Sequence, residues 1–371
     1  MSDLDARLHD ALDPLVNEGY LSGYVATART GSTTATAFGG VRDLASGQPM
    51  RADAIVRIAS LSKPVGAALT MTLVDDGLFD LDDPVGKWVP EFADVPVLRS
   101  PTAALDDVVP LARPMTIRPL LTMTSGLGWA APGSPIDNAL SESAVTNAST
   151  GDEFVETLAR LPLQFQPGDG WRYHTSAGVL SVLLARATGR DLSTLVEERI
   201  RAPLALDHLD FYCRDPARQA LAYAVSESGI FAPLPTSTLL APPPFKSVAG
   251  LLHATAADML AFLDDLASPT PRVVSAVSAA AIRSPQLTRA QRADAAEFLG
   301  AGYSYGFSVK VAVDRTARHG APGRFGWSGA TGVDAAADPA NDTTGVIYIF
   351  REIAAPDDER AITMFWDAVY A

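Results

Sequence analysis

A serine and a lysine three residues apart, Ser60 and Lys63, have the types and the spacing that acyl-transfer chemistry requires. They stand between an apolar stretch typical of a strand, 54–59, and a helical pattern over 61–76. Three residues are about one helical turn, so hydroxyl and amine lie on one face within hydrogen-bond reach. A neutral lysine can then activate the serine hydroxyl. The pattern predicts an enzyme that becomes acylated on Ser60.

The alternative is that Lys63 is a solvated residue near a helix start, because short motifs also arise by chance. Its position argues against this, since a cation in the first turn faces the positive end of the helix dipole at a cost of about 0.3–1 kcal/mol. Apolar residues then recur at helical spacing and predict one buried face, and Gly77 predicts the C-terminal stop. The face consists of Val65, Ala68, Leu69, Thr72 and Leu73. A buried helix that begins with Ser and Lys indicates a site.

Three further segments follow along the chain. Residues 116–127 read TIRPLLTMTSGL, residues 167–176 read PGDGWRYHTS, and residues 323–329 read GRFGWSG. Together with residues 57–92, and in the same order, they resemble segments of the serine β-lactamase-like family. That family comprises class C β-lactamases, penicillin-binding DD-peptidases and the esterases that share their fold. The resemblance covers nearly the whole chain.

The resemblance implies roles for the residues that match the family's motifs. Ser60 would attack a carbonyl carbon, and Lys63, with its pKa lowered by desolvation, would take the proton. Tyr173 resembles the family's second base, which carries the proton to the leaving group. The backbone amides of Ser60 and Ala330 would hold the oxyanion. For Tyr173, a plain core tyrosine stays the open alternative.

Two departures from the family pattern concern the substrate. Thr175 stands where the second motif usually has Asn or Ser, and it lacks the amide pair of Asn. The third motif, usually Lys-Thr-Gly, is Trp327-Ser328-Gly329, and an indole supplies no positive charge for a substrate carboxylate. Tryptophan at this place is typical of the esterase branch. The predicted substrate-binding residues are therefore Thr175, Trp327, Ser328 and Gly329, in a site for esters rather than penicillins, although Trp327 has the alternative of a buried structural indole.

Composition excludes several other classes. A net charge of −14 disfavours nucleic-acid binding. The single cysteine, Cys213, excludes an internal disulfide and is interpreted as a packing residue, and the five scattered histidines supply no zinc ligand cluster. We expect no metal and no cofactor. His174 and His319 are assigned no role.

The acidic, amphipathic start has no signal-peptide character, and no apolar run approaches about 18–20 residues, so we expect a cytoplasmic protein without a membrane span. The expected partner is a small ester or acyl substrate. The oligomeric state is not predicted.

The predicted fold is α+β, with an antiparallel sheet built from both termini and flanked by helices, and an inserted, mainly helical lobe. One domain, 1–371, would comprise a sheet lobe, 1–59 with 271–371, and a helical lobe, 60–270, with the site in the crevice between them. The expected strands are 22–30, 33–40, 303–313, 331–337 and 343–351, and the terminal helices are 3–19 and 356–370. Long Pro/Gly/Ser segments at 99–114, 128–150 and 229–246 are expected to be lids or site walls.

The predicted function is a serine hydrolase acting on carboxylic esters through an acyl-Ser60 intermediate. One alternative is an acyltransferase that uses the same residues to pass the acyl group to an alcohol or amine. Further alternatives are a β-lactamase or DD-peptidase, and a non-catalytic binding homologue. Residues 326–330 nearly match G-x-S-x-G, the elbow of α/β-hydrolases, but no histidine follows His319 to complete that triad.

Overall fold

The computed structural model describes the chain except residues 1, 144–149, 235–238, 316–318 and 354–358. Its main sheet has eight strands in the order β11-β12-β13-β14-β15-β1-β2-β3. The N-terminal strands are β1 (Gly23–Thr30), β2 (Thr33–Asp43) and β3 (Gln48–Pro49). The C-terminal strands are β11 (Tyr303–Tyr305), β12 (Lys310–Ala312), β13 (Phe325–Gly329), β14 (Val333–Asp338) and β15 (Thr343–Tyr348). β1 and β15 pair antiparallel, which confirms a sheet built from both ends of the chain.

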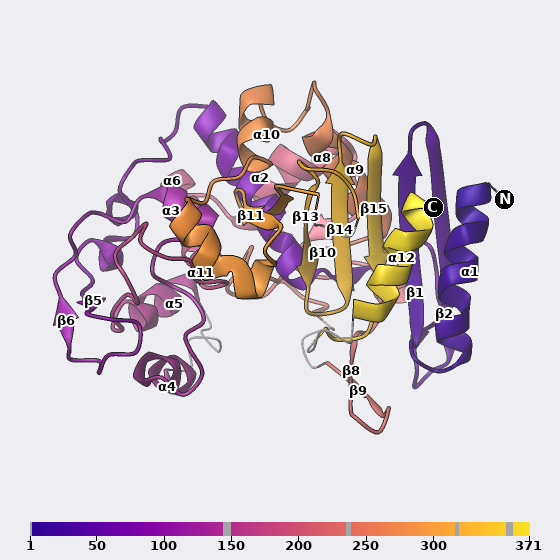
Figure 1. The fold of residues 1–371 in the computed structure, drawn as a ribbon, viewed down its shortest axis with the longest axis horizontal. Helices are drawn as coiled ribbons and strands as arrows, with labels where there is room; N and C mark the ends of the chain where they lie inside the picture. The colour runs from indigo at the N-terminus through magenta and orange to yellow at the C-terminus, as the bar shows by residue number, and fades with distance from the viewer. Residues whose placement is uncertain (1, 144–149, 235–238, 316–318, 354–358) are drawn as a thin grey trace.

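Helices cover both faces of this sheet. α1 (Asp3–Asn17) and α12 (Arg360–Tyr370) pack against each other on one face (Figure 1). α9 (Ala256–Ala267) packs on β14, β15 and β1. Along β1 the side chains alternate, so Ala26 and Ala28 join the apolar layer under α1 and α12, whereas Val25 belongs to the larger core on the other face. The sheet therefore separates two apolar layers, and the site lies on the side of the larger one.

Short helices and strands make up the rest of the chain. The helices are α2 (Ser62–Asp75), α3 (Ile117–Thr122), α4 (Pro135–Glu142), α5 (Gly151–Leu158), α6 (Ser176–Thr188), α7 (Leu192–Val196), α8 (Ala202–Leu204), α10 (Ala276–Ile282) and α11 (Arg289–Leu299). The strands are β4 (Val56–Arg57), β5 (Val97–Leu98), β6 (Val108–Val109), β7 (Leu209–Asp210), β8 (Tyr223–Val225), β9 (Phe231–Pro233) and β10 (His253–Ala254). Figure 1 shows this helical part beside the sheet. The predicted α+β class is confirmed.

The division into lobes at residues 60 and 270 stays a prediction. α9 falls in the range predicted for the helical lobe but packs on the sheet, and α10 falls in the range predicted for the sheet lobe but packs on α2. Among the described residues, no helix is long and apolar enough to cross a membrane.

Several predicted boundaries need correction. The strand expected over 303–313 is wrong, because the chain turns back at Gly306–Val309 and forms the hairpin β11–β12. The segment 128–150 contains α4, whose N-cap Ser134 accepts from the backbone of Asp137. The segments 99–114 and 229–246 contain β6 and β9. Residues 144–149 and 235–238 of these segments, and the start of the helix expected at 356, lie outside the described residues.

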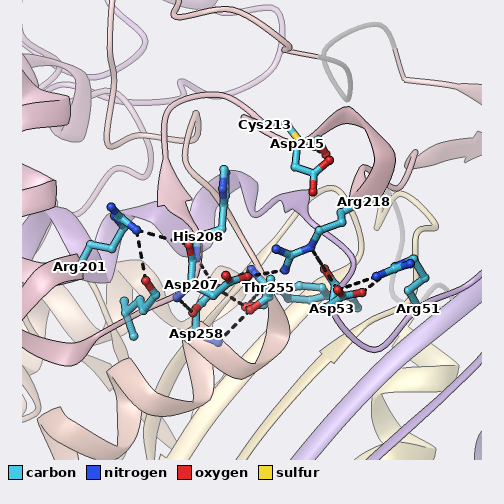
Figure 2. A network of polar contacts seen from close by, with 12 residues as sticks. Arg51, Asp53, Arg201, Asp207, His208, Cys213, Asp215, Arg218, Thr255 and Asp258 are labelled. Carbon is cyan, nitrogen blue, oxygen red and sulfur yellow. Dashed lines mark hydrogen bonds and ion pairs between the residues drawn. The ribbon is translucent and has the colours of Figure 1, made fainter.

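A polar network fixes the segment that leads into Ser60 (Figure 2). Asp258 completes the capping box of α9 with Thr255, and it also accepts from the backbone N–H of Asp207 at 2.7 Å. Arg218 pairs with Asp207 and donates from Nε to the backbone oxygen of Asp53 at 2.9 Å. The start of α9 is thus joined to the residues just before β4, and β4 runs directly into the site.

Candidate active site

Ser60 lies in a 3₁₀ turn, Ala59–Leu61, that joins β4 to α2. Ala59 has a φ of 44°, in the left-handed region that a non-glycine residue adopts only at a cost of about 1–3 kcal/mol. Such strain persists where the surrounding structure fixes it, and it is concentrated at functional sites. The side chain of Ser60 is partly exposed at this turn. The hydroxyl is therefore accessible on an otherwise buried segment.

Lys63 is directed at Ser60. Its Nζ donates to Ser60 Oγ at 2.9 Å and to the backbone oxygen of Ala249 at 2.6 Å. The side chain is almost completely buried, and burial lowers the pKa of Lys63 well below its ordinary value because the charged form loses its hydration. A neutral amine at hydrogen-bond distance from the hydroxyl is the arrangement that a general base requires.

α2 is buried on every side from Ser62 to Leu73, which corrects the prediction of one buried face. The helix packs on α6 and α10, and it has no solvent face until its last turn. Gly66 allows the segment around Val248 to approach α2 closely, because a Cβ at position 66 would lie 2.5 Å from a methyl carbon of Val248. The backbone N–H of Val248 donates to Ser181 Oγ at 2.9 Å. This contact fixes the position of the Ala249 carbonyl, which accepts the hydrogen bond from Lys63 Nζ.

Tyr173 joins the same cluster. Its ring centroid lies 4.7 Å from Lys63 Nζ, and its hydroxyl accepts from Trp327 Nε1 at 2.7 Å. Burial raises the pKa of Tyr173, and hydrogen bonds with Ser60 and Trp327 oppose that rise only in part. Tyr173 therefore carries its proton at neutral pH and is available as a proton donor.

Tyr173→Phe tests this role. It should lower kcat/KM for a simple ester by about 10²–10⁴-fold, the usual value of a general acid or base. The ring contacts remain, so thermal unfolding should change little. Steady-state kinetics on a p-nitrophenyl ester measure the effect. A loss of only a few-fold in kcat/KM would mean that Tyr173 lines the site without transferring a proton.

Trp327 and Ser328 point to opposite faces of the sheet, because successive side chains of a strand alternate. Trp327 contacts Tyr173 on the site face, whereas Ser328 Oγ donates to Asp334 at 2.7 Å, and that carboxylate also accepts from Trp366 of α12. The structure thus brings Trp327 to Tyr173, whose ring contacts Lys63, whereas the Ser328 hydroxyl is directed at Asp334. Substrate binding by Ser328 stays a prediction from the motif, and its hydroxyl is occupied by Asp334 in this structure.

Gly329 lies against the turn that carries Ser60. A Cβ at this position would lie 2.4 Å from the backbone oxygen of Ile58. Ala330 follows at the end of β13. Within the described residues, neither the Ser60 nor the Ala330 backbone N–H has a protein acceptor. This is consistent with the predicted oxyanion site, which stays a prediction.

Gly329→Ala tests this close approach. The added methyl must displace the Ile58 carbonyl, and with it the turn at Ser60, so we expect kcat/KM to fall on the order of 10-fold to 100-fold. We also expect a loss of unfolding free energy of about 1–3 kcal/mol. Gly250→Ala is the matched control, because its Cβ would meet Ala59 at an ordinary 3.5 Å. Equal effects of both changes would contradict the steric explanation.

Thr175 and His174 complete the second motif. Thr175 is the N-cap residue of α6 and is partly buried, and its side chain makes no capping hydrogen bond. His174 has a φ of 93° and stacks on Trp129 at a centroid distance of 5.4 Å. Burial, and to a smaller extent Lys63, lowers the pKa of His174 to about 3, so its ring is neutral. His319 pairs with Asp367 of α12.

Sequence reasoning missed two groups near the site. The Ala249 carbonyl reaches Lys63 from far along the chain, and no motif marks a backbone oxygen. Phe298 of α11 lies 4.8 Å from Tyr173 between ring centroids. A single aromatic residue in a polar helix was the only signal for it.

Cys213 is buried and donates from Sγ to the Asp215 carbonyl at 3.2 Å, as expected of a packing residue. The described residues include no cluster of His, Cys, Asp or Glu that could hold a metal ion.

A serine on a strained turn, a buried lysine and a protonated tyrosine define the class of serine acyl-transfer enzymes with a lysine base. Comparisons with known proteins agree. A family model described as Beta-lactamase matches residues 8–365. Esterase EstB of Burkholderia gladioli is 32% identical, over 89% of this chain and 86% of its own. Protein Rv1367c of Mycobacterium tuberculosis, strain H37Rv, is 34% identical, over 84% of this chain and 81% of its own.

Among solved structures, EstCE1, described as a hydrolase with promiscuous acyltransferase activity, has the same fold. Its TM-score is 0.83 at 22% identity, with 100% of this chain and 99% of that chain covered. The chain belongs to the beta-lactamase family, and it is a serine hydrolase of that family.

Proposed function

We propose that this protein is a carboxylic-ester hydrolase that works through an acyl-Ser60 intermediate. The observation that carries the proposal is the buried Lys63, which donates to Ser60 Oγ at 2.9 Å and has a lowered pKa. Trp327 at the third motif, hydrogen-bonded to Tyr173, favours an ester as the substrate. The similarity to esterase EstB supports the same substrate class.

In the acylation step, neutral Lys63 takes the proton of Ser60 while Oγ attacks the ester carbonyl carbon. The negative charge develops on the carbonyl oxygen, which the backbone N–H groups of Ser60 and Ala330 would stabilise. Tyr173 gives its proton to the departing alkoxide, and the C–O bond breaks. The proton on Lys63 then restores the tyrosine. In deacylation the same groups act in reverse on a water molecule, releasing the acid and free Ser60.

A β-lactamase or DD-peptidase is a weaker candidate. The lysine that would hold a substrate carboxylate is replaced by Trp327. Arg324 is close in sequence, but its guanidinium lies 4.1 Å from the ring of Trp366 on the α12 side of the sheet. Neither residue supplies a cation to the site.

We therefore expect turnover of nitrocefin and penicillins to be slow or absent, and turnover of short-chain p-nitrophenyl esters to be efficient. Parallel kinetics on one enzyme preparation measure both. Penicillin hydrolysis at the rate of a good ester would contradict the assignment of the third motif.

An acyltransferase is the second candidate, since the same acyl-enzyme can react with an alcohol or amine. Water is present at about 55 M, so an acceptor at millimolar concentration competes only if the site binds and orients it, an advantage that can reach effective molarities of about 10⁵ M. Two half-exposed aromatic side chains beside Tyr173, Trp129 and Phe298, favour this candidate because they could bind an acceptor.

The test measures the decay of acetyl-Ser60 with and without added alcohols and amines, and identifies the products. Free acetate as the sole product across a broad acceptor panel supports the hydrolase. Dominant new ester or amide at millimolar acceptor, with slow decay in buffer, favours the transferase. No acyl adduct on Ser60 at all would reject both. The proposed partner is a small ester or acyl donor, and the proposed compartment is the cytoplasm.

A further inference from the structure

Two large aromatic side chains at the site are half open to solvent. Trp129, in the segment between α3 and α4, is 55% exposed, and Phe298, near the end of α11, is 50% exposed. Aromatic rings gain free energy by burial, and neighbouring exposed rings mark a place where something apolar binds. The catalytic steps proposed above use neither ring. Their position beside the proton donor indicates which part of a substrate they contact.

Both rings pack around Tyr173. The centroid of Phe298 lies 4.8 Å from that of Tyr173 and 6.3 Å from that of Trp327. The Trp129 ring meets the Tyr173 ring edge-on at 5.2 Å and the Phe298 ring at 6.2 Å. Lys63 Nζ lies 4.7 Å from the centroid of the same tyrosine ring. Phe298 and Trp129 therefore form an open aromatic corner beside the tyrosine.

Further contacts hold the two rings in place. His174 stacks on Trp129 with an interplanar angle of 11°, and its neutral ring costs no buried charge. Trp171, which is buried, contacts Phe298 at 5.5 Å. Rings that are fixed before the ligand arrives lose little conformational entropy on binding. The corner is thus preorganised.

The chemistry assigns the corner to one side of the ester. Tyr173 delivers a proton to the leaving oxygen, so that oxygen, and the alcohol group attached to it, must lie next to Tyr173. The groups that surround Tyr173 on its open side then contact the alcohol portion and not the acyl portion. We infer that Phe298 and Trp129 form the alcohol subsite, and that this subsite selects esters of aromatic alcohols. The inference rests on the proposed function. In acyl transfer the same corner binds an aromatic acceptor alcohol.

Selection arises because an aromatic alcohol group can stack on Phe298 or meet Trp129 edge-on. Such ring pairs are favourable beyond simple burial and correspond to about two- to tenfold in affinity. A short alkyl alcohol covers little of either ring. The acyl group, once attached to Ser60, no longer depends on the corner when water is the acceptor.

The experiment uses three esters and reads each variant against wild type on the same substrate, so that intrinsic leaving-group reactivity cancels. The esters are 2-naphthyl acetate, ethyl acetate and ethyl phenylacetate. Phe298→Ala should lower kcat/KM for 2-naphthyl acetate about fivefold to tenfold and leave the two ethyl esters within about twofold. The hydrolysis rate of acetyl-Ser60 should not change. Trp129→Ala should act in the same direction. Phe38→Ala, which removes a 43% exposed phenylalanine of β2, is the control and should change none of them.

Phe298→Leu removes the ring but keeps an apolar side chain, so its thermal unfolding should be unchanged. It should nevertheless lose the preference in kcat/KM for the naphthyl ester over the ethyl esters. An equal loss on all three esters would overturn the inference. A loss of kcat/KM confined to ethyl phenylacetate would also overturn it, because the acyl group would then occupy the corner. A gain of kcat/KM on all three esters would overturn it too, because Phe298 would then block access to the site. Failure of the proposed function is read separately, as the absence of an acetyl adduct on Ser60 in the wild-type protein.

Discussion

Ser60→Ala should abolish ester turnover and covalent labelling by a fluorophosphonate. Ser60 Oγ is the acceptor for Lys63, and without it neither acylation nor deacylation has a nucleophile on the protein. We expect a loss in kcat on the order of 10⁴-fold or more. Intact-mass spectrometry of the wild type should give one adduct, located on Ser60 by peptide mapping.

Ser328→Ala is the matched control for this change. Ser328 belongs to the third motif, but its hydroxyl donates to Asp334 on the far face of the sheet. The variant should keep labelling and most of its activity. Ser176 is a second control, since it is buried and hydrogen-bonded to Ser125 at 2.8 Å. An adduct on either serine, or activity retained in Ser60→Ala, would reject the assignment.

The local part of the site was predictable from the sequence because its geometry depends on short spacings. Ser60 and Lys63 are one turn apart at a helix start, and any α-helix brings such residues together. Tyr173 and Trp327 were predicted by family resemblance, and the hydrogen bond between them supports that prediction. What spacing could not give was the face of a strand. Ser328 directly follows Trp327, but successive side chains of a strand point to opposite faces of the sheet.

The parts that were missed depend on long-range contacts. β13 was not predicted as a strand because glycines and a serine interrupt its apolar pattern, and two of its glycines are required by close approach of neighbouring backbone. Phe298 and the Ala249 carbonyl reach the site from segments whose own patterns carry no catalytic signal. The terminal helices and the β1–β2 hairpin were predicted well, since their apolar periodicity is regular.

Lys63→Arg should be nearly inactive. The guanidinium keeps its proton under all working conditions, so it cannot accept the proton of Ser60. A loss of about 10²–10⁴-fold in kcat/KM is expected for removal of the base. Lys246→Arg, at a lysine paired with Asp191, is the control and should behave as wild type. Activity of Lys63→Arg within a few-fold of wild type would require another base.

The buried lysine also makes stability depend on pH in a defined direction. The pKa of Lys63 is lowered in the folded state and ordinary, about 10.4, in the unfolded state, so between these two values the unfolded state binds one more proton. The free energy of unfolding must therefore rise with pH in this window. Lys63→Met has no such group. The stability of wild type relative to Lys63→Met should therefore increase as the pH is raised from neutrality toward about 10.4, measured by urea unfolding at each pH. A constant difference would mean that Lys63 remains protonated when folded, and an ammonium at this place could not serve as the base in acylation.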